Sequence, residues 1–219
     1  MRRIETEAAQ KVLLRAKKNR KKVKDTTGEL IEKVLRGSHK TYRYILITAL
    51  LAKSTNADID ALSLQAGDDS EGAYDARSLC HKVIVPFERE YYPNSIGGSN
   101  EPFLNKPARF TRLSEDNAVR RGNDMEILKI VIRILSSIKS SKSAFLYLSS
   151  AIYNIAQISK EEADKYTLPD LDIPQAELPQ TTLDYIIDLT RQSFEGEICP
   201  LVVSALEHLY YEGANKVVP

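Results

Sequence analysis

One stretch near the amino terminus has side chains of the type and density that contact a polyanion. The segment RAKKNRKKVK, residues 15–24 and here called the basic segment, holds seven positive charges in ten residues. They are Arg15, Lys17, Lys18, Arg20, Lys21, Lys22 and Lys24. Such clusters supply the sequence-independent part of nucleic-acid affinity because they neutralise phosphates. We therefore expect phosphate contact here. Two alternatives stay open, a solvated helix end and docking on the acidic carboxyl-terminal region.

A second group of candidate side chains lies in residues 91–115, here called the central loop. This stretch holds three prolines, three asparagines and a pair of glycines, and it interrupts an otherwise helical pattern. Long irregular segments in compact domains often carry function. Guanidinium and amide groups match two base-edge atoms at once. We therefore predict base-edge chemistry from Asn100, Asn105, Lys106 and Arg109, although the asparagines are also typical of turns.

The segment GAYDARSLCHKVIV before the loop places Arg77 and His81 four residues apart, on one face of a helix. Together they are suited to facing a phosphate. The structural alternatives are that Arg77 and Asp75 make ion pairs or caps, and that His81 is simply packed or solvated.

Groups that would hold a catalytic metal are not recognisable. No acidic residue stands two positions before a lysine, and Pro169-Asp170 has no partner motif of that kind. Neither a phosphate-binding Gly-x-x-x-x-Gly-Lys loop nor a cluster of zinc ligands occurs. We therefore predict no metal site and no cofactor in this chain. The acids left for an atypical metal site are Asp75, Glu88 and Glu101.

Composition is that of a globular protein, with 42% hydrophobic and 28% charged residues. The net charge of +1 conceals an asymmetry, since residues 1–53 carry +10 and residues 161–219 carry −9. Two distant cysteines make no disulfide framework, and no signal peptide or membrane span is visible. These features favour a cytoplasmic protein without membrane contact.

Hydrophobic periodicity predicts helices almost throughout, which indicates an all-α, irregular multi-helix fold. The expected helices cover residues 26–37, 40–53, 58–65, 70–85, 125–138, 143–157, 181–192 and 200–213. Thr26 and Glu29 have the spacing of a capping box, and Ser70 is a candidate cap. Pro86 should end or kink its helix, with a strand over residues 83–85 as an alternative. Residues 166–180 read as a Pro-rich extended connection.

The residues GAYDARSLCHKVIVPFERE, followed by GGSNEPFLNKPARF, resemble the SacI family of type II restriction endonucleases. The resemblance runs from about TYRYILITALLA to Arg109, roughly a third of the chain. It implies double-stranded DNA as substrate and Mg²⁺-dependent phosphodiester hydrolysis. Members of the family are longer, so the resemblance implies that residues 1–219 are one amino-terminal helical domain. The charge of residues 1–25 and the apolar residues before the basic segment predict a basic helical arm there. The metal site would then lie beyond Pro219.

These observations lead to one main hypothesis and two alternatives. The main hypothesis is a DNA-binding, target-recognition domain of a type II restriction endonuclease in a restriction-modification system. The first alternative is a helical interaction or dimerisation module of the same enzyme, which would make a homodimer. The second is a complete nuclease with an atypical metal site.

Overall fold

The computed structural model describes residues 4–67, 70–119, 123–165, 184 and 203. The chain divides into two compact units, residues 1–163 and 164–219, and nearly all described residues belong to the first. The expected connection at 166–180 and the helices at 181–192 and 200–213 lie almost entirely outside the described residues. The expectation of one domain over residues 1–219 therefore stays a prediction.

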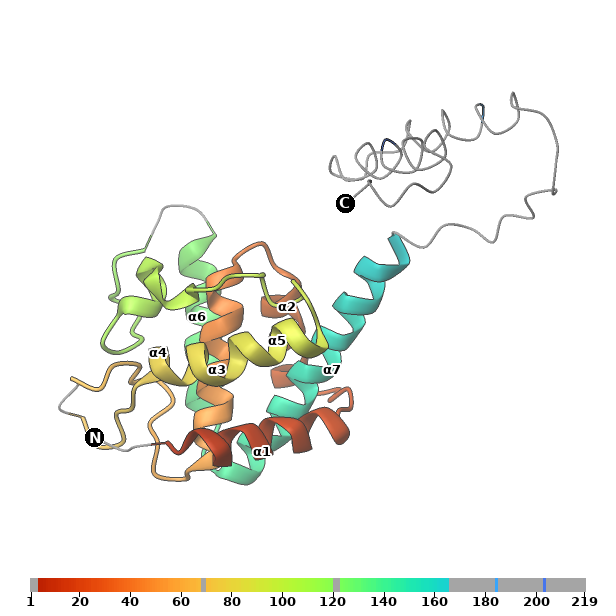
Figure 1. Cartoon of the computed structure of the whole chain (residues 1–219). Helices are drawn as coiled ribbons and strands as arrows, with labels where there is room; N and C mark the ends of the chain where they lie inside the picture. Colours follow the sequence, from red (N-terminus) through yellow and green to blue (C-terminus); the bar gives the residue numbers. More distant parts are fainter. Residues whose placement is uncertain (1–3, 68–69, 120–122, 166–183, 185–202, 204–219) are drawn as a thin grey trace. The chain divides into compact units, whose positions relative to one another are not determined.

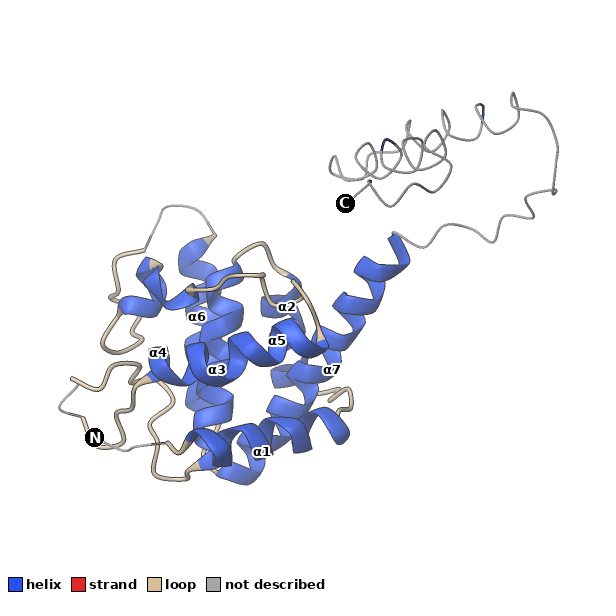
Figure 2. Ribbon diagram, in the orientation of Figure 1, coloured by secondary structure: helices blue, strands red, loops and turns tan. Residues whose placement is uncertain are grey.

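Helices joined by loops make up the described part of the chain (Figures 1 and 2), which confirms the all-α fold class. The α-helices are α1 (Thr6–Lys18), α2 (Thr26–Arg36), α3 (Lys40–Thr55), α4 (Ala76–Leu79), α5 (Val85–Tyr91), α6 (Asp124–Ser137) and α7 (Ser141–Lys165). A π-helical turn, η1 (Cys80–Ile84), joins α4 to α5, and two 3-10 turns, η2 (Pro102–Leu104) and η3 (Lys106–Arg109), lie in the central loop. The β pairing within these residues is an isolated bridge between Ser63 and Arg112.

Helix α3 forms the centre of the core, as its apolar pattern predicted. Ten of its residues are buried, from Tyr42 to Ala52. It contacts α1, α2, α4, α6 and the turns η1, η2 and η3, and Figure 1 shows it running through the middle of these elements. A helix that is apolar nearly all round needs neighbours on every side. Because η2 and η3 pack on α3, the central loop rests on the most buried helix of the unit.

The amino-terminal helices differ in two details from the sequence expectation. Helix α1 buries Ala9, Leu13 and Ala16 but ends at Lys18, so the second half of the basic segment is not helical. Helix α2 begins as expected, but its cap is Asp25 rather than Thr26. The Asp25 carboxylate accepts a hydrogen bond from the Gly28 N–H at 2.7 Å, which satisfies one of the free donors of the first turn.

A continuous rod formed by α4, η1 and α5 crosses α3 (Figure 1). It begins at Ala76, capped by Asp75, so the expected start at Ser70 is wrong. Pro86 does not end the rod. The π-helical turn lets the Val85 N–H reach the carbonyl of Cys80, and this wider turn makes room for the proline ring in the first turn of α5. The strand alternative at residues 83–85 is also wrong.

The expected helix at residues 58–65 is replaced by tight turns. The Asp60 carboxylate accepts from the Leu62 N–H, and the N–H groups of Leu64 and Leu113 donate to Thr111 and Leu62. Local side-chain bonds of this kind compete with a helix. This segment therefore holds the far end of the central loop. The helices expected at 125–138 and 143–157 are confirmed as α6 and α7, and α7 is longer than expected.

Candidate nucleic-acid interface

A buried carboxylate on α5 holds the central loop through hydrogen bonds to its backbone. Glu88 on α5 is 2% exposed, and its Oε1 accepts hydrogen bonds from the N–H groups of Ile96, Gly97 and Gly98 at 2.8, 2.8 and 3.0 Å. Its Oε2 accepts from the Tyr44 hydroxyl at 2.5 Å. A buried charge is tolerated only when it is hydrogen-bonded in this way. Four donors therefore tie one side chain to three successive loop residues and to α3.

Tyr44 and the paired glycines complete this attachment. The Tyr44 hydroxyl accepts from the Ser99 N–H at 2.9 Å while donating to Glu88, and burial together with this bond raises the pKa of Tyr44. The backbone of Gly98 has φ of +66°, and a Cβ there would lie 2.5 Å from the Asn94 Oδ1. A Cβ at Gly97 would crowd the Tyr44 ring. Glycine is therefore required where the backbone turns onto the carboxylate.

Arg77 and His81 share a face, as their spacing predicted, and both lie beside Glu101 of the central loop. The Arg77 Nη2 is 3.5 Å from the Glu101 Oε2, and the His81 Nδ1 is 3.8 Å from the Oε1. All three side chains are about half exposed. An exposed pair at this distance is weak. The face therefore remains accessible to a competing anion such as a phosphate.

Three of the four predicted loop residues lie together at η3, while Asn100 is set apart on the rod side of the loop. Asn100 accepts a hydrogen bond from the Arg89 guanidinium on α5. The Asn105 amide donates to the Pro102 carbonyl at 3.4 Å, which is a turn contact. Lys106 and Arg109 lie on η3 with exposed side chains, and neither forms an ion pair within the described part of the chain. Of the four, these two cations are the most available for contact with DNA.

The basic segment is divided between engaged and free cations. The Arg15 guanidinium lies 4.4 Å from the centre of the Phe145 ring, and the Lys17 amine lies 3.3 Å from that of Tyr91. Arg20 donates to the Lys17 carbonyl, and Lys22 forms an ion pair of 2.8 Å with Glu32. Lys18, Lys21 and Lys24 are exposed, and within residues 4–67, 70–119 and 123–165 they form no ion pair.

The carboxylates considered for an atypical metal site are engaged elsewhere. Asp75 caps α4 through the Ser78 N–H at 2.9 Å and hydroxyl at 2.6 Å. Glu88 holds the loop, and the Glu101 carboxylate lies beside Arg77 and His81. Among the described residues, no group of three or more His, Cys, Asp or Glu side chains is arranged to hold a metal ion. These donors do not fit a Mg²⁺ site, which needs carboxylate oxygens free to bind the ion.

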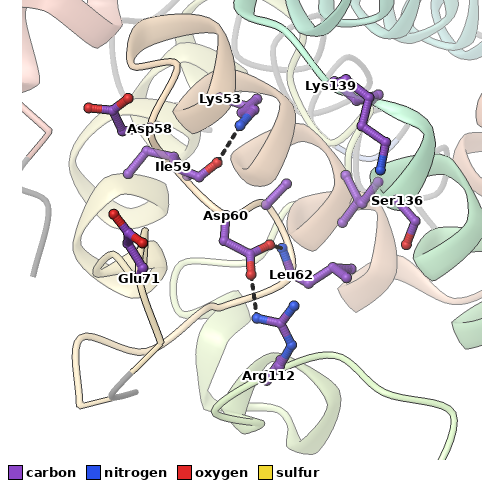
Figure 3. Close-up of a pocket in the computed structure, with 12 residues that line it drawn as sticks. Lys53, Asp58, Ile59, Asp60, Leu62, Glu71, Arg112, Ser136 and Lys139 are labelled. Carbon is purple, nitrogen blue, oxygen red and sulfur yellow. Dashed lines mark hydrogen bonds and ion pairs between the residues drawn. The ribbon is translucent and has the colours of Figure 1, made fainter.

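A polar cavity of about 450 Å³, shown in Figure 3, lies away from the predicted residues. Three of its charged side chains make contacts of their own. The Lys53 amine donates to the carbonyls of Ala57 and Ile59 at 2.7 Å each, and the Asp60 carboxylate accepts from Arg112. These contacts hold residues 57–62 against the end of the central loop. This cavity was not predictable from the sequence, because its lining comes from five separate segments.

Comparison with known proteins connects this arrangement to one family. A family model described as the SacI restriction endonuclease N-terminal domain matches residues 5–159, which is more than half of the chain. The chain belongs to this family. The resemblance noted in the sequence is thereby confirmed. The SacI N-terminal domain match covers the basic segment, the rod and the central loop, and it ends inside α7.

One relative of the SacI N-terminal domain family is the type II restriction enzyme SacI of Streptomyces achromogenes. It is 35% identical over 77 residues, which are 35% of this chain and 21% of that enzyme. The matched segment thus spans about a fifth of the relative's length. Among the described residues of this chain, no helix is both long and apolar enough to cross a membrane. The cytoplasmic location stays a prediction.

Sequence reasoning missed Glu88 and Tyr44 as the groups that position the loop. The signal that pointed to them was the Gly97-Gly98 pair, because two adjacent glycines allow a close approach of backbone to another group. Nothing in the sequence identified the approaching group as a carboxylate 9 residues away.

Proposed function

We propose that this SacI N-terminal domain binds double-stranded DNA and reads its target sequence for a type II restriction endonuclease. Base edges would be read from the central loop, with Arg109 as the first candidate, and phosphates would be contacted by the free lysines of the basic segment. The other part of the enzyme would supply the Mg²⁺ and the carboxylates that hold it.

The observation that carries this proposal is the way Glu88 holds the central loop. A loop whose backbone is bound at three successive N–H groups loses little conformational entropy when a ligand docks on it. Lys106 and Arg109, further along the same loop on η3, are exposed, and so is Lys82 on the rod. A fixed backbone with available cations is suited to direct readout, since bidentate base contacts need defined geometry.

A binding selection tests this function directly. The 219-residue chain is incubated with duplexes of randomised sequence, and the bound fraction is amplified and sequenced. We expect one short sequence to be enriched, and fluorescence anisotropy with that duplex should give tighter binding than with a shuffled duplex at the same salt concentration. Equal binding to both duplexes, or no binding at low salt, would contradict the proposal.

Two further measurements address the alternatives. Addition of Mg²⁺ to the chain and the enriched duplex should produce no cleavage, because among the described residues no group of three or more His, Cys, Asp or Glu side chains is arranged to hold a metal ion. Specific fragments that vanish with a chelator would favour the complete nuclease instead. Sedimentation of the chain with no DNA then tests the dimerisation module, which predicts a dimer without DNA affinity.

A further inference from the structure

A second cavity lies where the central loop meets the amino end of α3. It has a volume of about 290 Å³, and its lining comes from residues 38–42, from Asn105 to Pro107, and from Val119 and Asp124. It is distinct from the Arg77 and His81 face. The predicted residues Asn105 and Lys106 therefore lie beside the start of α3.

The buried Tyr42 hydroxyl is the unusual feature of this cavity. Tyr42 lines the cavity and is 1% exposed, but its hydroxyl has no hydrogen-bond partner among the described residues. Burial, and to a lesser degree the charge of Asp124, raises the pKa of Tyr42, so this group is a proton donor at neutral pH. An unsatisfied buried hydroxyl is costly, and such groups call for a partner.

The surroundings of this hydroxyl favour an anionic partner. Helix α3 has 16 residues, and its first residues line the cavity. Its N-cap His39 makes no side-chain capping bond, although the N–H groups of Lys40 and Tyr42 donate to backbone carbonyls, and the amino end of a helix carries a partial positive charge. Lys40 and Lys106 approach from two different segments, and neither forms an ion pair within the described part of the chain. Two lysines from different segments thus border the cavity that Tyr42 also lines.

Asp124 is the group that opposes an anion here. Its Oδ1 is 2.8 Å from the Nδ1 of His39, and it lies in the first turn of α6, where the helix dipole stabilises a negative charge. Its carboxylate is thus already engaged, and the two lysines outnumber it. The balance of charge around the cavity is positive.

We propose that this cavity binds a phosphate group, with the Tyr42 hydroxyl donating to one oxygen and with Lys40 and Lys106 neutralising its charge. This deepens the proposed function and rests on it for the source of the phosphate, which is the DNA backbone. The site would place the amino end of α3 on one strand while the neighbouring loop residues read the bases.

Thermal unfolding with inorganic phosphate tests the site without DNA. The melting temperature of the 219-residue chain is compared in chloride and in phosphate at equal ionic strength and pH. We expect phosphate to raise it, and the rise to shrink in the double variant Lys40→Gln/Lys106→Gln. The control variant Lys142→Gln/Lys160→Gln, exposed on α7, should keep the full rise, because excluded-ion effects act on any surface.

The variant Tyr42→Phe tests the contribution of the hydroxyl to phosphate binding separately from that of the lysines. Removal of an unsatisfied hydroxyl should raise the melting temperature in chloride and reduce the further rise in phosphate. The site is overturned by a phosphate-dependent rise that is equal in the wild type, in the lysine double variant and in Tyr42→Phe.

Duplex binding measured over a range of salt concentrations tests whether the phosphate belongs to the DNA backbone or is a free ion. If the site holds one backbone phosphate, Lys40→Gln/Lys106→Gln should reduce the slope of log affinity against log salt by roughly 0.9, or about eightfold in affinity at 0.1 M salt. An unchanged slope together with the expected phosphate result assigns the site to free phosphate. A chain that binds no DNA refutes the proposed function, while the phosphate measurement still decides the site.

Discussion

The basic segment and the central loop are the two regions with polar side chains suited to DNA, and the fold treats them differently. Glu88 fixes residues 96–98 of the loop through three successive backbone N–H groups, while Lys106 and Arg109, further along on η3, remain exposed. The basic segment is attached through its own cations, with Lys17 on Tyr91 and Lys22 on Glu32.

This difference assigns separate tasks to similar residues. A cation that already contacts an aromatic ring or a carboxylate must give up that contact to bind phosphate, whereas an exposed lysine has only water and counterions to release. A base contact requires in addition a backbone of defined position. The comparison therefore predicts that affinity depends on the free lysines of the basic segment and that specificity depends on the loop.

The largest effect is expected from the free cations of the basic segment. If each lysine neutralises one phosphate, the triple variant Lys18→Gln/Lys21→Gln/Lys24→Gln should reduce the slope of log affinity against log salt by roughly 2.7. At 0.1 M salt this corresponds to a loss of about 4 kcal/mol in binding free energy. Anisotropy titrations over a series of salt concentrations measure the slope. Three exposed lysines outside the segment, Lys11, Lys142 and Lys160, provide the matched control. Equal slopes for the two triple variants would remove the segment from the interface.

The second-largest effect is expected on stability, when the attachment of the loop to Glu88 is removed. Glu88→Gln replaces a charged acceptor of four hydrogen bonds by an amide that has one acceptor oxygen, and we expect a loss of about 3 kcal/mol in the free energy of unfolding. Urea unfolding measures it. Glu90→Gln, exposed on the same helix, should change the unfolding free energy by less than about 0.5 kcal/mol. A similar stability for both variants would mean that the loop is held by other contacts.

Specificity provides the third test. Arg109→Ala should weaken binding to the enriched duplex by about 2 kcal/mol and leave the shuffled duplex almost unaffected, because a bidentate base contact is lost. Arg77→Ala, on the face of the rod that we propose to contact phosphate, should weaken both duplexes alike. The ratio of the two dissociation constants at fixed salt is the measurement. An equal loss on both duplexes from Arg109→Ala defeats the base-readout assignment.

The smallest expected effect on stability and DNA affinity comes from the ion pair between Lys22 and Glu32. Glu32 pairs with Lys22 and Arg36, and the hydrogen bond from Lys22 lowers the pKa of Glu32 from its ordinary value of 4.5. Its stabilising contribution is therefore present above the unfolded pKa and is lost as the pH falls through the lower folded value. Glu32→Gln should be slightly less stable than the wild type at pH 7, and this difference should vanish in strong acid.

The same variant should bind duplex slightly more tightly at neutral pH, because Lys22 is then free for phosphate. Anisotropy at pH 7 measures this, and Lys22→Gln serves as the control that removes the cation altogether. Unchanged affinity in Glu32→Gln would indicate that Lys22 faces away from the DNA.

Periodicity in the sequence was sufficient to predict the helical class and the most buried helices. Helices α3 and α6 appear where apolar residues recur at helical spacing, because a helix of that composition is stable only when its apolar sides are covered. Local side-chain chemistry was harder to predict. The residue that caps α2 is Asp25 and not the predicted Thr26, and the Asp60 carboxylate stabilises a turn where a helix was expected.

The sequence by itself determined which residues carry charge, where the helical pattern breaks, and which family the motif resembles. Only the tertiary structure decided which of those charges are free. Glu88 meets Tyr44 and the loop backbone, and Lys22 meets Glu32, whereas the Tyr42 hydroxyl has no hydrogen-bond partner among the described residues. Packing around α3 brings these groups together or keeps them apart. Helix periodicity is set by neighbours three and four residues away, whereas the cost of burying a polar group depends on donors and acceptors from distant segments.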